Sequence, residues 1–316
     1  MTLSAKQKPQ FRLRIGSRDS KLAVAQSRLV MAAIQKLHPQ AELELITMKT
    51  TGDLILDRPL DQIGGKGLFV KELDQALLDG RADLTVHSLK DLPAEENPAL
   101  PLVAFSRRED PRDCLILPAG VEALDLTKPI GCSSLRRQLQ LKALYPGCRL
   151  EPVRGNVQTR LRKLDEGQFG ALVLAAAGLT RLGLQERICR YYEPEEMLPA
   201  ACQGIIAVQA RRDIIEDLDN RYGGSGSFFQ GFSDPSVYWI VQAERAFIRT
   251  LEGGCSSPTA AYATISGHQM TLRGLYWDEA TDRWQIDSSQ GPREEAARLG
   301  HELALSMKGA SYGKNR

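Results

Sequence analysis

The alternation of strand and helix patterns along the first half of the chain is the feature that most limits its fold. Residues 12–17, 42–48 and 82–87 have the pattern of strands, and residues 20–37 and 67–79 have helical periodicity. This order predicts a mostly parallel sheet covered by helices, with ligands bound beyond the carboxyl ends of its strands. Five residues form the expected apolar face of the first helix: Leu22, Ala25, Leu29, Ala33 and Leu37.

A second alternating unit follows the charged turn near residues 107–111. Its predicted strands are 114–117, 130–132, 149–153 and 171–175, and its predicted helices are 135–144 and 157–166. The apolar stretch 205–210 is expected to return to the first sheet. The sequence therefore predicts two α/β lobes around a cleft, as in periplasmic-binding-protein-like folds.

Composition changes after this second unit. Residues 213–235 are rich in Gly and Ser and indicate a linker or loop. Beyond it, helices at 236–251 and 292–307 flank strands at 261–264, 270–276 and 283–287, which predicts a small α+β domain. The expected domains are 1–107 with 205–222, then 108–204, and finally 235–316.

Composition also excludes several classes of protein. The longest apolar run, 171–179, is too short for a membrane span of about 20 residues, and the polar N-terminus lacks a signal peptide. Six cysteines without a CxxC pair favour reduced thiols, and the four histidines show no metal-ligand spacing. We expect a cytoplasmic protein with no membrane partner and no bound metal.

Positive charge is concentrated in one short stretch, although the whole chain carries only +2. Residues 128–163 hold nine basic residues and a single acid, Glu151. A solvated helical face is the ordinary interpretation of such a run. Here, however, several of the arginines follow predicted strands in GCSSLRR and RGNVQTR, where the planar guanidinium suits carboxylates or phosphates. Few aromatic residues and no nucleic-acid-binding motif accompany them, so a small polycarboxylate fits better than nucleic acid.

Two further residues stand out. Asp91 follows a predicted strand in HSLKDLP, and it is either a surface partner of Lys90 or an acid/base group at the lip of the cleft. Cys255, in LEGGCSSP, is either a small buried residue or a loop thiol able to carry a covalent group.

Together these segments closely resemble the porphobilinogen deaminase family. The matching blocks spread over nearly the whole chain in the family's order: IGSRDSKLAVAQ (15–26), GGKGLFVKELDQALLDGRADLTVHSLKDLP (64–93), REDPRDCL (108–115), GCSSLRRQLQL (131–141), VRGNVQTRLRKLD (153–165), AAAGLTRLGL (175–184), LPAACQG (198–204) and LEGGCSSP (251–258).

The resemblance implies three domains, a monomer, and a dipyrromethane cofactor joined by a thioether to Cys255. It also implies that four porphobilinogen units are condensed head to tail with loss of ammonia, and that 1-hydroxymethylbilane is released by hydrolysis. Each pyrrole carries an acetate and a propionate, which explains the arginine-rich cleft.

The resemblance assigns roles to single residues as well. Asp91 would be the catalytic carboxylate, and Lys66 would belong to a mobile lid over residues 49–66. Besides Cys255, the cofactor would be bound by Arg18, Ser20, Lys90, Ser134, Arg136, Arg137, Arg154 and Gln203. The substrate would be bound by Arg18, Arg154, Arg160 and Arg181.

Three features depart from the family's pattern. Cys132 stands where a hydroxyl residue is usual, SSPTAAY follows the expected cofactor cysteine, and the Gly/Ser-rich stretch 222–235 is longer than typical. A non-enzymatic two-lobed protein that binds a small polycarboxylate is the main alternative. It would explain the arginines, but not Asp91 or LEGGC. A thiol hydrolase using Cys255 lacks a nearby histidine motif.

Overall fold

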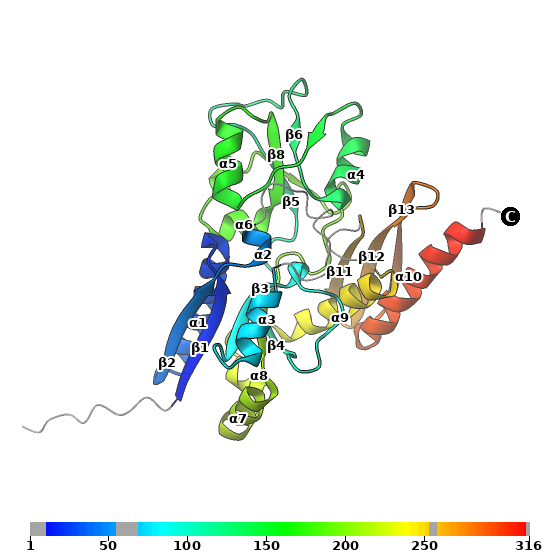
Figure 1. The fold of residues 1–316 in the computed structure, drawn as a ribbon. Coiled ribbons are helices and arrows are strands. Elements are labelled where there is room, and N and C mark those ends of the chain that lie inside the picture. The colour runs from blue at the N-terminus through cyan, green and yellow to red at the C-terminus, as the bar shows by residue number, and fades with distance from the viewer. Residues whose placement is uncertain (1–10, 55–68, 253–257, 314–316) are drawn as a thin grey trace, which may run out of the picture.

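The computed structural model describes residues 11–54, 69–252 and 258–313, which form two α/β lobes and a smaller C-terminal domain (Figure 1). The predicted architecture is therefore confirmed. Within those residues, no helix combines the length and the apolar character that crossing a membrane requires.

The first lobe is built on a five-stranded sheet of order β2-β1-β3-β10-β4. Its strands are β1 (Phe11–Arg18), β2 (Ala41–Met48), β3 (Leu84–Ser88), β4 (Leu102–Phe105) and β10 (Ile206–Ala210). Strand β1 runs parallel to β2 and β3, whereas β10 is antiparallel to both β3 and β4. The predicted return of the chain to the first sheet is thus correct. Helices α1 (Lys21–Leu37), α2 (Thr51–Leu54) and α3 (Lys71–Leu78) belong to this lobe.

Helix α1 lies where it was predicted, but it buries a different face. Ala23, Ser27, Val30 and Ile34 are buried, whereas Leu29 is 50% exposed. The buried stripe also has helical spacing although it includes Ser27, so periodicity alone does not decide between the two faces. Packing against the sheet decides, and Val30 and Ile34 join its core.

The second lobe has the sheet order β7-β6-β8-β5-β9. Its strands are β5 (Asp113–Ile116), β6 (Ile130–Gly131), β7 (Leu150–Glu151), β8 (Ala171–Ala175) and β9 (Arg190–Tyr192). Helices α4 (Leu135–Leu144) and α5 (Val157–Asp165) begin immediately after short loops that follow β6 and β7, and α6 (Ala176–Arg181) follows β8 directly. The arginine-rich motifs are therefore placed at strand-to-helix turns, as predicted.

The predicted linker at 213–235 is wrong for most of its length. Helix α7 (Arg212–Tyr222) and the short helix α8 (Ser225–Phe228) occupy it, and Phe228 and Phe229 are fully buried in the core of the first lobe. The ring of His38 stacks on Phe228 at 4.5 Å between centroids. Two adjacent aromatic residues thus anchor a segment whose Gly and Ser content suggested a loop.

The C-terminal domain packs two helices on an antiparallel three-stranded sheet. The sheet consists of β11 (Ala260–Ser266), β12 (Gln269–Asp278) and β13 (Arg283–Pro292). Helices α9 (Pro235–Thr250) and α10 (Ala296–Gly313) pack together, and residues such as Phe247, Leu272 and Leu303 form the core between helices and sheet. The described residues also form three short 3-10 helices: η1 (Leu89–Asp91), η2 (Gln185–Arg187) and η3 (Arg293–Glu295).

Candidate active site

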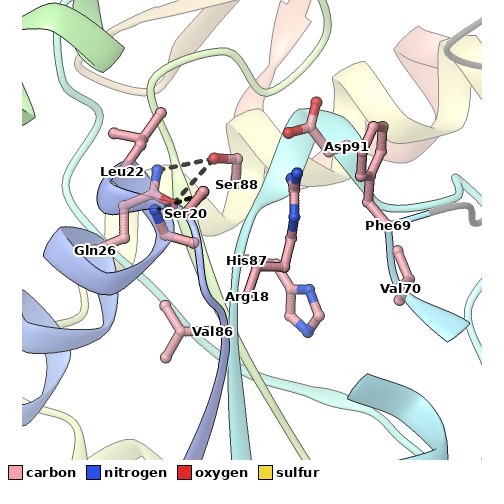
Figure 2. Close-up of a pocket in the computed structure, with 11 residues that line it drawn as sticks. Arg18, Ser20, Leu22, Gln26, Phe69, Val70, Val86, His87, Ser88 and Asp91 are labelled. Atoms are coloured by element: carbon pink, nitrogen blue, oxygen red, sulfur yellow. Dashed lines mark hydrogen bonds between the residues drawn. The ribbon is translucent and has the colours of Figure 1, made fainter. Parts of the chain in front are cut away.

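A pocket opens at the carboxyl ends of β1 and β3, where the sequence places its candidate chemistry (Figure 2). Strand β3 is buried, and Leu89 is 1% exposed, which fixes the start of η1. Asp91, the last residue of η1, is half-buried and lines the pocket together with Arg18, Ser20 and Ser88. Among the described residues, the carboxylate of Asp91 has no hydrogen-bonding or ion-pair partner.

Arg18 lies at the end of β1 and is paired within its own lobe. Its Nε donates to Asp53 Oδ2 at 3.1 Å, its Nη2 bonds Asp53 Oδ1, and its guanidinium lies 4.2 Å from the centre of the Phe69 ring. Burial would raise the pKa of Asp53, but hydrogen bonds from Arg18 and Thr50 outweigh it and lower the pKa. The sequence analysis did not predict that Arg18 contacts Asp53 and Phe69.

Two other polar residues of this pocket have structural roles. The Ser20 hydroxyl caps α1 by accepting the N–H of Ala23 at 3.3 Å. His87 also lines the pocket; it is 6% exposed and its Nε2 lies 2.9 Å from Thr85 Oγ1. Burial lowers the pKa of His87 to about 4, so its ring is neutral near pH 7.

The paired arginines of SSLRR are buried against a single carboxylate. Arg136 Nη1 donates to Asp113 Oδ2 at 2.7 Å, and Arg137 donates to Asp113 Oδ1 from Nε at 3.0 Å and from Nη2 at 2.8 Å. Burial alone would raise the pKa of Asp113, but the two guanidiniums outweigh it and hold that pKa well below its usual range. Because Asp113 lies outside residues 128–163, the charge bias in the sequence overstates the free positive charge of this lobe.

Gln203 and Lys90 connect this cluster to the segment that carries Asp91. Gln203 is fully buried: its Nε2 donates to Asp113 Oδ1 at 2.8 Å, and its Oε1 accepts the ammonium of Lys90 at 3.2 Å. Burial lowers the pKa of Lys90 to about 8, with Arg137 and Arg136 acting in the same direction and Asp91 and Asp113 opposing them.

Arg160 and Arg181 differ from the arginines above. Both are half-buried, and they donate to the backbone carbonyls of Gly155 and Gly204 respectively. In the part of the chain that the structure describes, no carboxylate lies within ion-pair distance of either guanidinium. Burial lowers the pKa of each to about 10, and the positive charges of Arg137 and Arg154 add to the effect on Arg160. Both groups are therefore cations that an anionic ligand would stabilise.

The remaining candidates of this lobe lie on the loops before α4 and α5. Ser134 is the N-cap residue of α4, but its hydroxyl does not cap that helix. Arg154 is half-buried, and burial lowers its pKa. Cys132 is 1% exposed, and its thiol lies 3.7 Å from the carbonyl oxygen of Ser134. Burial raises the pKa of Cys132, so this departure from the family's pattern is an un-ionised thiol beside the arginines.

Glu244 on α9 joins the C-terminal domain to the two lobes, and the sequence analysis missed it. Its fully buried carboxylate accepts hydrogen bonds from Arg108 Nη1 at 2.7 Å and from the backbone N–H groups of Cys202 and Ala263, the latter at 2.7 Å. Arg108 also donates to the carbonyl oxygen of Gln203 at 2.9 Å. The buried carboxylate therefore fixes α9 relative to the segment that carries Gln203.

Two predicted residues, Lys66 and Cys255, lie outside the described residues. Within the described ones, no group of His, Cys, Asp and Glu side chains could hold a metal ion.

Comparison with known proteins gives two family matches. Residues 13–217 match the model of "Porphobilinogen deaminase, dipyromethane cofactor binding domain", and residues 238–309 match "Porphobilinogen deaminase, C-terminal domain". A protein of Alkaliphilus oremlandii named porphobilinogen deaminase is 55% identical over 307 residues, which is 96% of this chain and 100% of that protein. One of Ruminiclostridium josui with the same name is 57% identical, covering 94% of this chain and 98% of that protein. Among solved structures, the methionine-binding protein MetQ aligns with a TM-score of 0.43 at 12% identity, over 73% of this chain and 94% of that one.

Proposed function

The chain belongs to the porphobilinogen deaminase family, and from that premise we propose which of its residues carry out the reaction. The reaction joins four porphobilinogen molecules head to tail with loss of ammonia, and 1-hydroxymethylbilane is then released by hydrolysis. Residues 13–217 match the domain that binds the dipyrromethane cofactor. When bound, this group supplies the pyrrole to which the first substrate unit is joined.

One observation supports the assignment of the second lobe as the carboxylate-binding surface. Arg160 and Arg181 are half-buried cations without a carboxylate partner among the described residues. A buried charge is stable only when it is paired. Every pyrrole unit of substrate and cofactor carries an acetate and a propionate, so the ligands supply the missing anions.

The donor set of the site fits these ligands. We assign cofactor binding to Arg18, Ser20, Lys90, Ser134, Arg136, Arg137, Arg154 and Gln203. We assign substrate binding to Arg18, Arg154, Arg160 and Arg181. Arg160 and Arg181 would bind carboxylates directly, whereas Arg18 would first have to share its guanidinium with Asp53.

Asp91 is the proposed catalytic carboxylate. It lines the pocket at the carboxyl end of β3 and accepts no hydrogen bond from the other described residues, so its oxygens can accept pyrrole N–H groups. Its negative charge would stabilise the positive charge that develops on the substrate as ammonia leaves. The charge of Asp91 acts to raise the pKa of Arg160, which supports assigning these two residues of different lobes to one site.

Further assignments complete the proposal. Cys255 would form the thioether to the cofactor, and Lys66 would belong to a lid over the site. We propose a cytoplasmic monomer that does not bind nucleic acid, with domains 1–107 plus 205–222, 108–204 and 235–316. The burial of Phe228 and Phe229 supports extending the first domain through them.

Substitution at Asp91 tests this proposal. Asp91→Asn keeps the size of the side chain and removes its charge, and we expect it to be nearly inactive, with single-turnover rates on cofactor-loaded enzyme lowered by about 10²–10⁴. Asp91→Glu keeps the charge but moves it by about 1 Å, so weak activity should remain. Intact mass should show the cofactor in both variants, because Asp91 is not the anchor. Near wild-type turnover by Asp91→Asn would move the catalytic role to another residue.

A further inference from the structure

Asp113 is the only carboxylate among the described residues that bonds both guanidiniums of the SSLRR motif. It is fully buried, at the first position of β5, and its Oδ1 also accepts the amide of Gln203. Its motif, REDPRDCL, belongs to the family resemblance, yet neither the sequence nor the proposed function gives it a role.

The two arginines are held in fixed directions by this carboxylate together with the backbone. Arg136 Nη1 also donates to the carbonyl of Leu198 at 2.6 Å, and Arg137 Nη1 donates to the carbonyl of Val173 at 3.2 Å. A guanidinium has five N–H groups in a rigid plane, so bonds on one edge set the direction of the rest. Arg137 also adds its charge to the surroundings of Arg160, one of the cations that lacks a carboxylate.

Gln203 extends the same arrangement to the other lobe. Its amide nitrogen donates to Asp113 and to the carbonyl of Pro111 at 2.7 Å, and its amide oxygen accepts the Lys90 ammonium. The side chain is fully buried and both its polar atoms are engaged by the protein. Gln203 is therefore suited to positioning Lys90, the neighbour of Asp91.

We propose that Asp113 is a positioning residue of this active site: one buried carboxylate orients Arg136 and Arg137 directly, and Lys90 through Gln203. Anion-binding side chains of both lobes are thereby fixed to the same group. This inference rests on the proposed function, because it requires that these cations bind the carboxylates of the cofactor to which the substrate is joined.

The first test replaces Asp113 with asparagine in the full-length enzyme. The amide of Asp113→Asn presents N–H donors where guanidinium donors already point, so one arginine must turn away. We expect a folded protein that either lacks the cofactor by intact mass or has a KM for porphobilinogen raised about 10- to 100-fold, with a smaller change in kcat. An unchanged or lowered KM in a cofactor-loaded Asp113→Asn enzyme would overturn the proposal.

Asp83→Asn is the matched control. Asp83 is also a buried aspartate paired with an arginine, accepting Arg14 Nε at 3.0 Å and Nη2 at 2.8 Å, but it lies at the opposite end of β3 from Asp91. It should lose stability as Asp113→Asn does, yet load cofactor and keep its KM. An equal rise of KM in both variants would mean that Asp113 acts only through stability.

Gln203→Met provides a second test that leaves the buried ion pairs intact. Removing the acceptor disfavours the Lys90 ammonium, so the alkaline limb of the pH profile of kcat/KM should move to lower pH. An unmoved alkaline limb would overturn the link to Lys90.

Arg136→Gln and Arg137→Gln separate this inference from the proposed function. If they raise KM while Asp113→Asn does not, the inference alone fails; if neither arginine matters, the carboxylate-binding role fails with it.

Discussion

Replacing Arg160 with methionine should make the cofactor-free protein more stable while impairing ligand binding. The guanidinium is half-buried, bonds only the carbonyl of Gly155 within the described chain, and lies near the charges of Arg137 and Arg154. Methionine has a similar length and no charge. A residue retained despite a cost in stability is the expected signature of function.

The magnitude follows from the pKa of Arg160. Burial and the neighbouring arginines lower this pKa from 12.5 to about 10, which corresponds to a cost of about 3 kcal/mol for keeping the group charged. For a base with a lowered pKa in the folded protein, this cost is fully present below pH 10 and disappears as the pH rises above the pKa of the unfolded chain. Losing the bond to Gly155 offsets about 1 kcal/mol. The variant should therefore gain about 2 kcal/mol at pH 7.

Urea unfolding of Cys255→Ser proteins would measure this gain without interference from a covalent cofactor. Arg162→Met is the matched control, since Arg162 lies on the same helix with its side chain 70% exposed. Its stability should change by less than about 0.5 kcal/mol. With Cys255 present, Arg160→Met should leave a ligand carboxylate unpaired at a cost of about 2–5 kcal/mol, seen as a raised KM or a stalled intermediate. Loss of stability together with a normal KM would refute the reasoning.

Three further predictions follow from other charged groups. The pKa of Lys90 is about 8, so its ammonium loses its charge, and its hold on the carboxylates of the cofactor, as the pH rises through 8. The value of kcat/KM should therefore fall over this range, and Lys90→Arg should remove this limb from the pH profile; the same limb in the variant would contradict the assignment. Burial, opposed by a hydrogen bond from Gln209, raises the pKa of Asp74 to about 6, so at pH 7 the carboxylate is ionised at a cost in folding free energy. Urea unfolding should show that Asp74→Asn stabilises the protein by about 1 kcal/mol at pH 7, after allowance for solvent screening, but does not stabilise it below pH 4. No gain in stability at pH 7 would contradict this prediction. Glu244→Gln should lower the free energy of unfolding by about 3 kcal/mol and the Tm by about 10 °C, because it breaks a buried ion pair with Arg108. Glu302→Gln, which breaks an exposed ion pair, should change the Tm little. Equal losses in the two variants would contradict the role of Glu244.

The sequence predicts the order of the elements well because local periodicity and strand-to-helix turns determine them. The ten residues of α4, for example, coincide with the predicted helix. The loop prediction for residues 213–235 is wrong because Phe228 and Phe229 determine how this segment packs. These two residues contact residues far away in the chain, such as His38. The prediction of the buried face of α1 is wrong for the same reason, since tertiary packing chooses between two faces of the helix.

The site is predicted in its composition but not in its charge balance. Sequence reasoning places the basic residues near one another, yet it cannot tell which of them have a protein carboxylate. Asp53 and Asp113 pair with Arg18 and Arg136 over separations of 35 and 23 residues. Only the fold reveals these pairs, and they distinguish positioned arginines from Arg160 and Arg181.

The most direct test of the central claim is the intact mass of the purified protein under denaturing conditions. The account predicts the polypeptide mass plus two pyrrole units for the wild type, and the bare polypeptide mass for a folded Cys255→Ser variant, because the thiol is the proposed attachment point. A wild-type protein at its bare polypeptide mass, or a Cys255→Ser protein that still carries covalent pyrroles, would contradict it.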